Sequence, residues 1–219
     1  MKCKICRERK PRRFCPGVHG DICSICCGQE REVTVDCPLD CAYLQESRQY
    51  ERVPEPDPAD FPNQDIRVSE SFLRDHEPLL LFLASMTMRL SLDTPGAVDS
   101  DVREALDSLI RTYRTLQSGL VYESMPQNPI AAAIHERVQG AVADFRKRIA
   151  DSGNATSIRD AEILGVFVFL QRLAIQHDNK RRKGRAFVDF LSRYFVPPQL
   201  AHETAPSQLD APPSGLIIP

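Results

Sequence analysis

Apolar residues recur at helical spacing over much of the chain between residues 69 and 195. Spacings of three and four residues place apolar side chains on one face of a helix. One such stripe comprises Val102, Leu106, Leu109, Ile110, Tyr113 and Leu116. It predicts a helix that ends near Gly119, because glycine accepts the left-handed conformation common after a helix C-terminus.

A second amphipathic helix is predicted to follow Asn128 and Pro129, a pair suited to an N-cap and a first helical turn. Its stripe comprises Ile130, Ile134, Val138, Val142, Phe145 and Ile149, and Gly153 would end it. Two other segments, Leu79 to Met88 and Ile163 to Ala174, are apolar on nearly every side. That pattern is typical of central helices surrounded by others.

A last helix is predicted around Phe187, Phe190, Leu191 and Tyr194. No stretch alternates with the two-residue period of a half-buried strand. The predicted fold class is therefore mainly α: a helical bundle of about five helices that follows a small cysteine-rich segment.

The composition changes three times along the chain. Residues 1–50 contain every cysteine, and residues 51–68 contain Pro54, Pro56, Pro58 and Pro62, which predict a stiff, extended linker. Residues 69–196 form the predicted bundle. Residues 197–219 contain six prolines and few groups that could form a core, so we expect a disordered tail.

Length and charge limit the class of protein. A chain of 219 residues with 42% apolar residues can form a substantial core. A net charge of −2 argues against binding nucleic acid or an anionic membrane over the whole surface, so such a partner would need a local basic patch. The charged first residues lack the apolar region of a secretory signal, and no apolar run approaches the roughly 20 residues of a membrane span. We therefore expect a cytoplasmic protein without a membrane partner.

In a reducing cytosol, eight cysteines confined to the first 41 residues indicate metal ligands better than disulfides. With one histidine they form four close groups: Cys3 and Cys6; Cys15 and His19; Cys23 and Cys26 or Cys27; Cys37 and Cys41. Structural zinc takes four nitrogen or sulfur ligands, so these groups predict two Zn²⁺ ions. An iron–sulfur cluster is the lesser alternative.

The order of these ligands resembles the RING pattern, in which alternate groups share a zinc. The resemblance covers only the first 41 residues or so. It implies one zinc on Cys3, Cys6, Cys23 and Cys26 or Cys27, and another on Cys15, His19, Cys37 and Cys41. Sequential pairing of neighbouring groups is the alternative.

The spacing of Cys23 and Cys27 is instead similar to HIT and MYND fingers, which share the interleaved topology. Cys26 is favoured over Cys27 as a ligand because Cys23 and Cys26 repeat the spacing of Cys3 and Cys6. Proteins with these fingers act mainly through interactions. The resemblance therefore implies protein binding before chemistry.

Two segments are strongly basic. Residues 2–13 carry seven Lys or Arg, which either offset the nearby thiolates or form a phosphate-contacting patch. The second segment is Lys180, Arg181, Arg182, Lys183 and Arg185. It is either a solvated connection between two helices or a surface for the phosphates of a nucleic acid.

No catalytic motif was found, so the sequence favours a non-enzymatic role. We expect a zinc-binding adaptor that engages macromolecular partners, most readily proteins, through the finger and the bundle. The alternative is a nucleic-acid-binding protein that uses segments 2–13 and 180–185. A RING-like ubiquitin ligase ranks below both, because Arg48 is the first basic residue after Cys41, whereas RING ligases generally carry one shortly after the final ligands.

Overall fold

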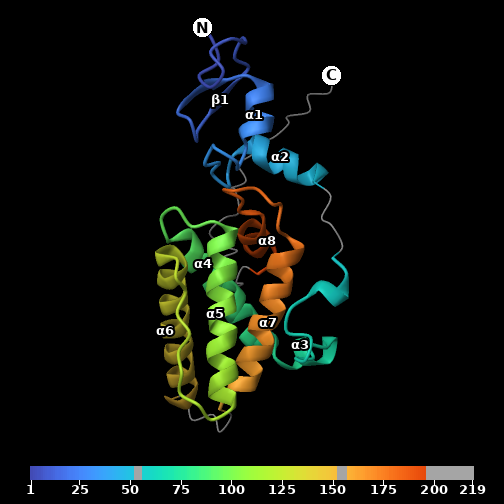
Figure 1. Ribbon diagram of the computed structural model, residues 1–219, viewed down its shortest axis with the longest axis vertical. Helices are drawn as coiled ribbons and strands as arrows, with labels where there is room; N and C mark the ends of the chain where they lie inside the picture. The colour runs from blue at the N-terminus through green and yellow to red at the C-terminus, as the bar shows by residue number, and fades with distance from the viewer. Residues whose placement is uncertain (52–55, 152–156, 196–219) are drawn as a thin grey trace, which may run out of the picture.

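The computed structural model describes residues 1–51, 56–151 and 157–195. It is mainly helical, as the sequence predicts, with a cysteine-rich segment at one end of an elongated helical bundle (Figure 1). The predicted tail 197–219 and the predicted stop at Gly153 lie outside the described residues. Residues 1–50 are called the finger below, and residues 69–195 are called the bundle.

The finger contains a short hairpin and two helices. Strands β1 (Arg13–Cys15) and β2 (Gly20–Ile22) pair antiparallel, with Phe14 opposite Asp21. Helix α1 (Ser24–Glu30) follows the hairpin directly, and α2 (Ala42–Tyr50) follows the last cysteine. In Figure 1 the hairpin and α1 lie at the end of the molecule remote from the bundle, and α2 lies between α1 and α8.

Six helices form the bundle within the described residues, one more than the five predicted: α3 (Glu70–Asp75), α4 (Glu77–Leu92), α5 (Asp99–Gln117), α6 (Pro129–Asp151), α7 (Asp160–Gln176) and α8 (Ala186–Tyr194). The additional helix is α3. Its six residues are too few to show a periodic apolar stripe, and it begins where the Ser69 hydroxyl accepts a hydrogen bond from the Phe72 N–H.

Two of the predicted boundary signals, at Gly119 and at Asn128, are confirmed. Gly119 has a φ of +77°, and its N–H donates to the carbonyl of Leu116 as α5 ends. The side-chain oxygen of Asn128 accepts from the N–H of Ile130 at the start of α6.

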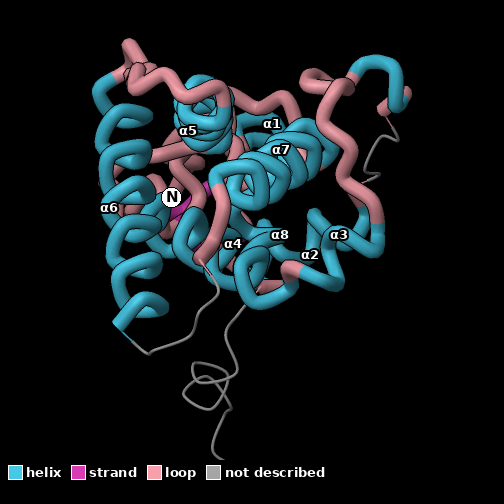
Figure 2. Tube along the Cα trace, turned by 90° about the horizontal axis from the view of Figure 1, so that it is seen from below, coloured by secondary structure: helices cyan, strands magenta, loops and turns pink. Residues whose placement is uncertain are grey.

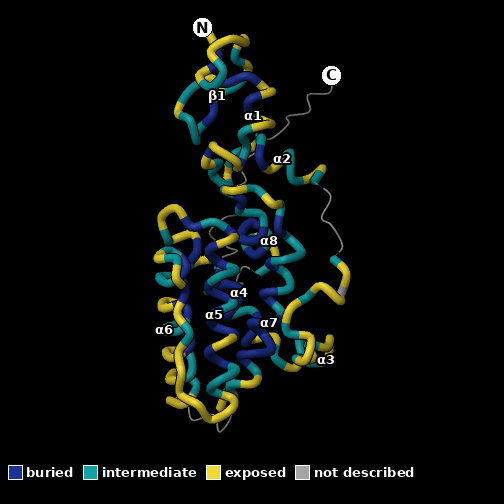
Figure 3. Tube along the Cα trace, in the orientation of Figure 1, coloured by how far each residue is buried: buried dark blue, intermediate teal, exposed yellow. Residues whose placement is uncertain are grey.

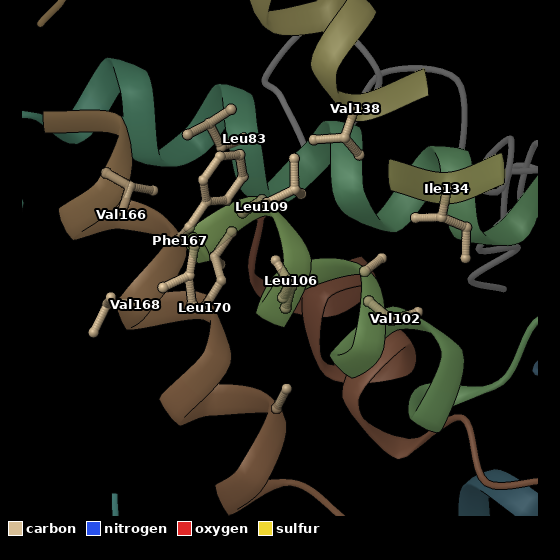
Figure 4. Close-up of a cluster of buried hydrophobic side chains, with 14 of the residues drawn as sticks. Leu83, Val102, Leu106, Leu109, Ile134, Val138, Val166, Phe167, Val168 and Leu170 are labelled. Atoms are coloured by element: carbon tan, nitrogen blue, oxygen red, sulfur yellow. The ribbon is translucent and has the colours of Figure 1, made fainter. Parts of the chain in front are cut away.

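The bundle core lies between α4, α5, α6, α7 and α8. Viewed along the long axis, α4 to α7 surround a common centre (Figure 2). Buried positions face inward along α5 and α7, whereas the outer side of α6 is exposed (Figure 3). Phe167 of α7 is fully buried and reaches toward Leu83 of α4 and Leu109 of α5 (Figure 4). All residues from Ile163 to Val168 of α7 are buried, as expected from their continuous apolar run.

The described part of the predicted linker runs along the bundle. Ile66 and Val68 pack against the bundle core, and Asp65 forms a two-pronged ion pair with Arg114 of α5. The amide of Asn63 donates to Gln171 of α7 over 2.8 Å. None of the helices in the described ranges has the length and apolar character that crossing a membrane requires.

Candidate metal centre and its junction with the bundle

Four cysteine side chains converge inside the finger. The Sγ atoms of Cys3, Cys6, Cys23 and Cys26 all lie within 4.8 Å of one another. Sulfurs bound tetrahedrally to zinc at about 2.3 Å would lie about 3.8 Å apart. The four-cysteine cluster therefore has the ligand type, number and spacing that a structural metal ion requires, and all eight cysteines are free thiols.

Local backbone geometry brings these sulfurs together. Cys3 and Cys6 flank a tight turn that Arg7 ends with a φ of +58°, its N–H donating to the Cys3 carbonyl. Cys23 is the N-cap of α1, and its Sγ accepts from the Cys26 N–H over 3.4 Å. The Cys23 N–H in turn donates to the Cys3 Sγ over 3.2 Å. These N–H groups favour thiolates at the positions where a metal would hold them.

The thiols of the cluster differ in acidity. Burial raises the pKa of Cys3, but hydrogen bonds from the N–H groups of Cys23, Cys6 and Ile5 outweigh it and lower that pKa to about 6. Burial and the neighbouring sulfurs raise the pKa of Cys26 to about 12. The four sulfurs alone therefore cannot all ionise near neutral pH. A bound dication removes that obstacle, because coordinating thiols are deprotonated outright.

The thiol of Cys27, which directly follows Cys26, lies close to arginine side chains instead. The Cys27 Sγ lies 3.8 Å from Arg13 Nη1 and 3.8 Å from Arg31 Nη2, and it is not part of the four-cysteine cluster. Arg9 instead lies beside the cluster, with Nη1 at 3.9 Å from the Cys23 Sγ and 4.0 Å from the Cys26 Sγ. Two arginines of the basic segment 2–13 thus lie against sulfur atoms.

The remaining predicted ligands are arranged more loosely. Cys15 ends β1 and is buried, and Cys41 is the N-cap residue of α2. Burial raises the pKa of Cys37, and the neighbouring Cys15 and Cys41 thiols raise it further. His19 is exposed, with a φ of +50°. In the part of the chain that the structure describes, these four residues do not form a second group as compact as the four-cysteine cluster.

Gly17 explains how the loop before His19 reaches Cys37. A Cβ at Gly17 would lie 2.3 Å from the Asp36 carbonyl oxygen and 2.8 Å from the Val35 side chain. Only glycine permits this approach between the Cys15 loop and the Cys37 segment. The structure thus brings Cys15 and Cys37 into one neighbourhood, although they are 22 positions apart.

The finger and the bundle meet at a buried polar junction, formed by Glu32, Arg48, Asn179, Arg185 and Asp189. Glu32 has no exposed surface. Its carboxylate accepts from Arg48 Nη2 at 2.7 Å, from Asn179 Nδ2 at 2.9 Å and from the Arg185 N–H at 3.0 Å. Arg48 also pairs with Asp189 Oδ2 at 2.9 Å. A buried chain of charges therefore runs from the finger through α2 to α8.

The N-terminus of α8 is satisfied by carboxylates from two distant parts of the chain. Glu32 accepts the Arg185 N–H, whereas Asp99 of α5 accepts the N–H groups of Phe187 and Val188 at 2.9 and 3.2 Å. Burial raises the pKa of Asp99 to about 7, although these N–H groups lower it. Carboxylates are favoured here because the first N–H groups of a helix lack partners within it.

A pocket of about 240 Å³ adjoins the junction. Arg48 and Glu51 line it from the finger side, and His177, Phe190 and Tyr194 line it from the bundle. The His177 and Phe190 rings are stacked with centroids 3.8 Å apart. One wall of this pocket is therefore present only when the finger packs against the bundle.

Most of the basic segment 180–185 takes part in contacts within the protein. Lys180 pairs with Asp178, Arg185 pairs with Asp36, and Arg181 pairs with Glu51. Arg181 Nη1 also donates to the Arg31 carbonyl of the finger over 3.0 Å. Arg182 is exposed, and Lys183 contributes its backbone N–H to the Glu32 carbonyl over 2.7 Å. The segment therefore contacts the finger through Arg181, Lys183 and Arg185.

Three of the seven basic side chains in segment 2–13 have polar contacts within the finger. Arg9 and Arg13 lie at sulfur atoms, and the Lys4 ammonium donates to the carbonyls of Val18 and His19 at 3.0 Å each. The other four basic side chains are exposed and have no ion pair among the residues that the structure covers: Lys2, Arg7, Lys10 and Arg12. Part of the segment lies beside cysteine sulfurs, and part faces solvent.

The junction was not predicted from the sequence. Glu32 and Asp189 stand among ordinary charged residues, and their burial comes from chain segments more than a hundred positions away. No family model, no curated protein and no solved structure matches this chain.

Proposed function

We propose that this protein is a zinc-dependent interaction protein, in which metal organises the finger and the finger presents a surface to a protein partner. The four-cysteine cluster carries this proposal, because four thiol sulfurs within 4.8 Å match a closed structural zinc site. Four protein ligands leave no position for a substrate or an activated water. The metal is accordingly assigned a structural role.

The finger needs such a metal. Its core consists mainly of the cysteines themselves with Ile22 and Val35, and Leu44 of α2 is the other buried aliphatic residue of the finger. A segment of about 50 residues with so few large apolar groups does not fold alone without metal or disulfides.

A second zinc is proposed on Cys15, His19, Cys37 and Cys41. Three features support it: the effect of Cys15 and Cys41 on the pKa of Cys37, the close approach of two chain segments at Gly17, and the resemblance to interleaved double-zinc fingers. Binding would draw the exposed His19 ring toward the three sulfurs. The two sites together would hold the finger at both ends.

The proposed partner surface lies on the finger away from the bundle. Phe14 of β1 and Ile25 of α1 are 59% and 48% exposed, and both elements lie at the end of the molecule remote from α8 (Figure 1). Exposed aromatic and aliphatic groups beside the cations of segment 2–13 suit a protein partner with apolar and acidic side chains.

Elemental analysis and native mass spectrometry of the full chain, purified without added metal, test the metal assignment. Two zinc ions per chain are expected. One zinc would remove the second site, and iron with sulfide would replace zinc by a cluster. A chain that binds no metal would refute the proposal.

Partner binding needs a separate test. The variant carrying Phe14→Ser and Ile25→Ser should retain its metal but lose partners captured by the unaltered chain. A matched control, Leu92→Ser, changes an apolar residue on α4 that is 46% exposed and should retain those partners. Equal capture by both variants would rule out the surface.

The nucleic-acid alternative receives less support, because three of the five basic side chains of segment 180–185 are paired within the protein. Heparin binding with a steep salt dependence would favour it. The exposed cations Lys2, Arg7, Lys10 and Arg12 would then be the contacts to replace.

A further inference from the structure

Glu32 occupies a strained position between the cysteines and the bundle. It lies two residues after α1 and has a φ of +53°, which is uncommon for a residue other than glycine. Such conformations persist where the surrounding structure holds them. Here the groups that hold Glu32 belong to both the finger and the bundle.

On the bundle side, Glu32 is held by three groups of one loop. Its carboxylate accepts from Asn179 Nδ2 and from the Arg185 N–H, and its carbonyl accepts from the Lys183 N–H. These contacts fix the connection between α7 and α8. The Phe187 and Val188 N–H groups, two residues further on, bind Asp99 of the bundle instead.

On the finger side, Glu32 is flanked by both sets of cysteines. Cys23 of the four-cysteine cluster is the N-cap of α1 and Cys26 lies in its first turn, and α1 ends at Glu30, two residues before Glu32. Val35 and Asp36, which lie between Glu32 and Cys37 in the chain, pack against Gly17 of the loop that follows Cys15. A change in the fold of either set of cysteines therefore displaces Glu32.

We propose that metal occupancy of the finger is coupled to its seating on the bundle through Glu32. Loss of metal withdraws Glu32 from the loop between α7 and α8 and removes the finger wall of the adjoining pocket. This proposal rests on the metal site proposed above. Coupling is reciprocal in free energy, so a change that weakens the packing of the finger on the bundle must also weaken metal binding by the same factor.

Amide hydrogen exchange on the zinc-loaded full chain, followed by NMR before and after chelation, tests the coupling. The N–H groups of Lys183 and Arg185 should exchange faster once zinc is removed. The N–H groups of Phe187 and Val188 should change much less, because their acceptor is Asp99 of α5, which has no hydrogen bond to the finger in the described structure. This second pair is an internal control for general loosening of the bundle.

The substitution Glu32→Gln tests the reciprocal effect without altering a cysteine. Zinc affinity, measured by competition with a chelator, should fall between about 5-fold and about 150-fold, the usual range for coupled sites. The exchange of Lys183 and Arg185 should accelerate while zinc is still bound. The matched control is Glu30→Gln, because in the described contacts the Glu30 carboxylate accepts only from the Thr34 hydroxyl of the finger.

The outcomes separate the two proposals. A chain that never binds zinc refutes the metal site and the coupling together. Zinc loss confirmed by native mass spectrometry, with unchanged exchange at Lys183 and Arg185, refutes the coupling alone. Equal zinc affinity for Glu32→Gln and Glu30→Gln also refutes it. Equal acceleration at Phe187 and Val188 would show general unfolding and overturn the assigned route through Glu32.

Discussion

Arg48 is the buried cation of the junction, and its replacement by methionine measures what the junction contributes to stability. Its side chain is 7% exposed and lies between two carboxylates, 2.7 Å from Glu32 and 2.9 Å from Asp189. It also donates to the Arg185 carbonyl over 3.2 Å. Methionine has a similar length and favours helices, so Arg48→Met removes the charge with little change in volume or helix propensity.

The expected loss follows from the partners that remain. Removing one member of a buried ion pair costs about 3–5 kcal/mol, because it leaves an uncompensated charge. Asp189 keeps Arg193 at 2.8 Å, and Glu32 keeps Asn179 and a backbone N–H. We therefore expect the lower end, about 3 kcal/mol. For a chain of this size that corresponds to a fall in Tm of roughly 6–12 °C.

Urea and thermal unfolding of the zinc-loaded chain, followed by circular dichroism, would measure this loss. Arg137→Met is the matched control, because Arg137 pairs with Asp93 over 3.6 Å on the exposed surface. Exposed pairs contribute about 0–1 kcal/mol. If Arg48→Met is no more destabilising than this control, the buried network does not hold the finger, and the reasoning from burial is wrong.

Three further predictions follow from single side chains. Cys26→Ser should reduce the zinc content seen by native mass spectrometry, whereas Cys27→Ser should leave it unchanged; the opposite result would reassign the ligand. His135 is fully buried without a hydrogen bond to either ring nitrogen in the described structure, and burial lowers its pKa, so His135→Leu should raise the unfolding free energy by about 1–3 kcal/mol. Because the unfolded state binds the proton more readily, the unaltered chain should lose stability as the pH falls below about 6.5, and urea titrations should show that His135→Leu loses less. Gly17→Ala should unfold the finger, since its Cβ would strike the Asp36 carbonyl; normal zinc content in this variant would contradict that close approach.

Much of the bundle could be predicted because its helices carry long periodic patterns. The stripe from Val102 to Tyr113 is buried as expected, and the signals at Gly119 and Asn128 mark the observed ends. Helix α3 was missed because six residues contain less than two turns of pattern. Its place depends on packing, since Phe72 lies over Gly165, where a Cβ would be 2.5 Å from the ring.

The candidate site was only partly accessible to sequence reasoning. Cysteine spacing alone suggested which residues could share a metal, because a ligand pair on a tight turn is a local feature. The role of Glu32 was not accessible, since nothing in its neighbourhood distinguishes it from Glu30. Its burial depends on Asn179 and Arg185, 147 and 153 positions away, and no periodic pattern records such a contact.

The separation between Glu32 and Arg185 has a consequence for the synthesis of the chain on the ribosome. Glu32 is translated 153 residues before the N–H that it accepts. At about 5–20 residues per second, that interval is about 8–30 s. During this time Glu32 and Arg48 have no bundle partners, so on the proposed function the finger would have to remain folded on its own metal. The timing of metal binding during translation would therefore determine whether the finger is already folded when α8 is complete.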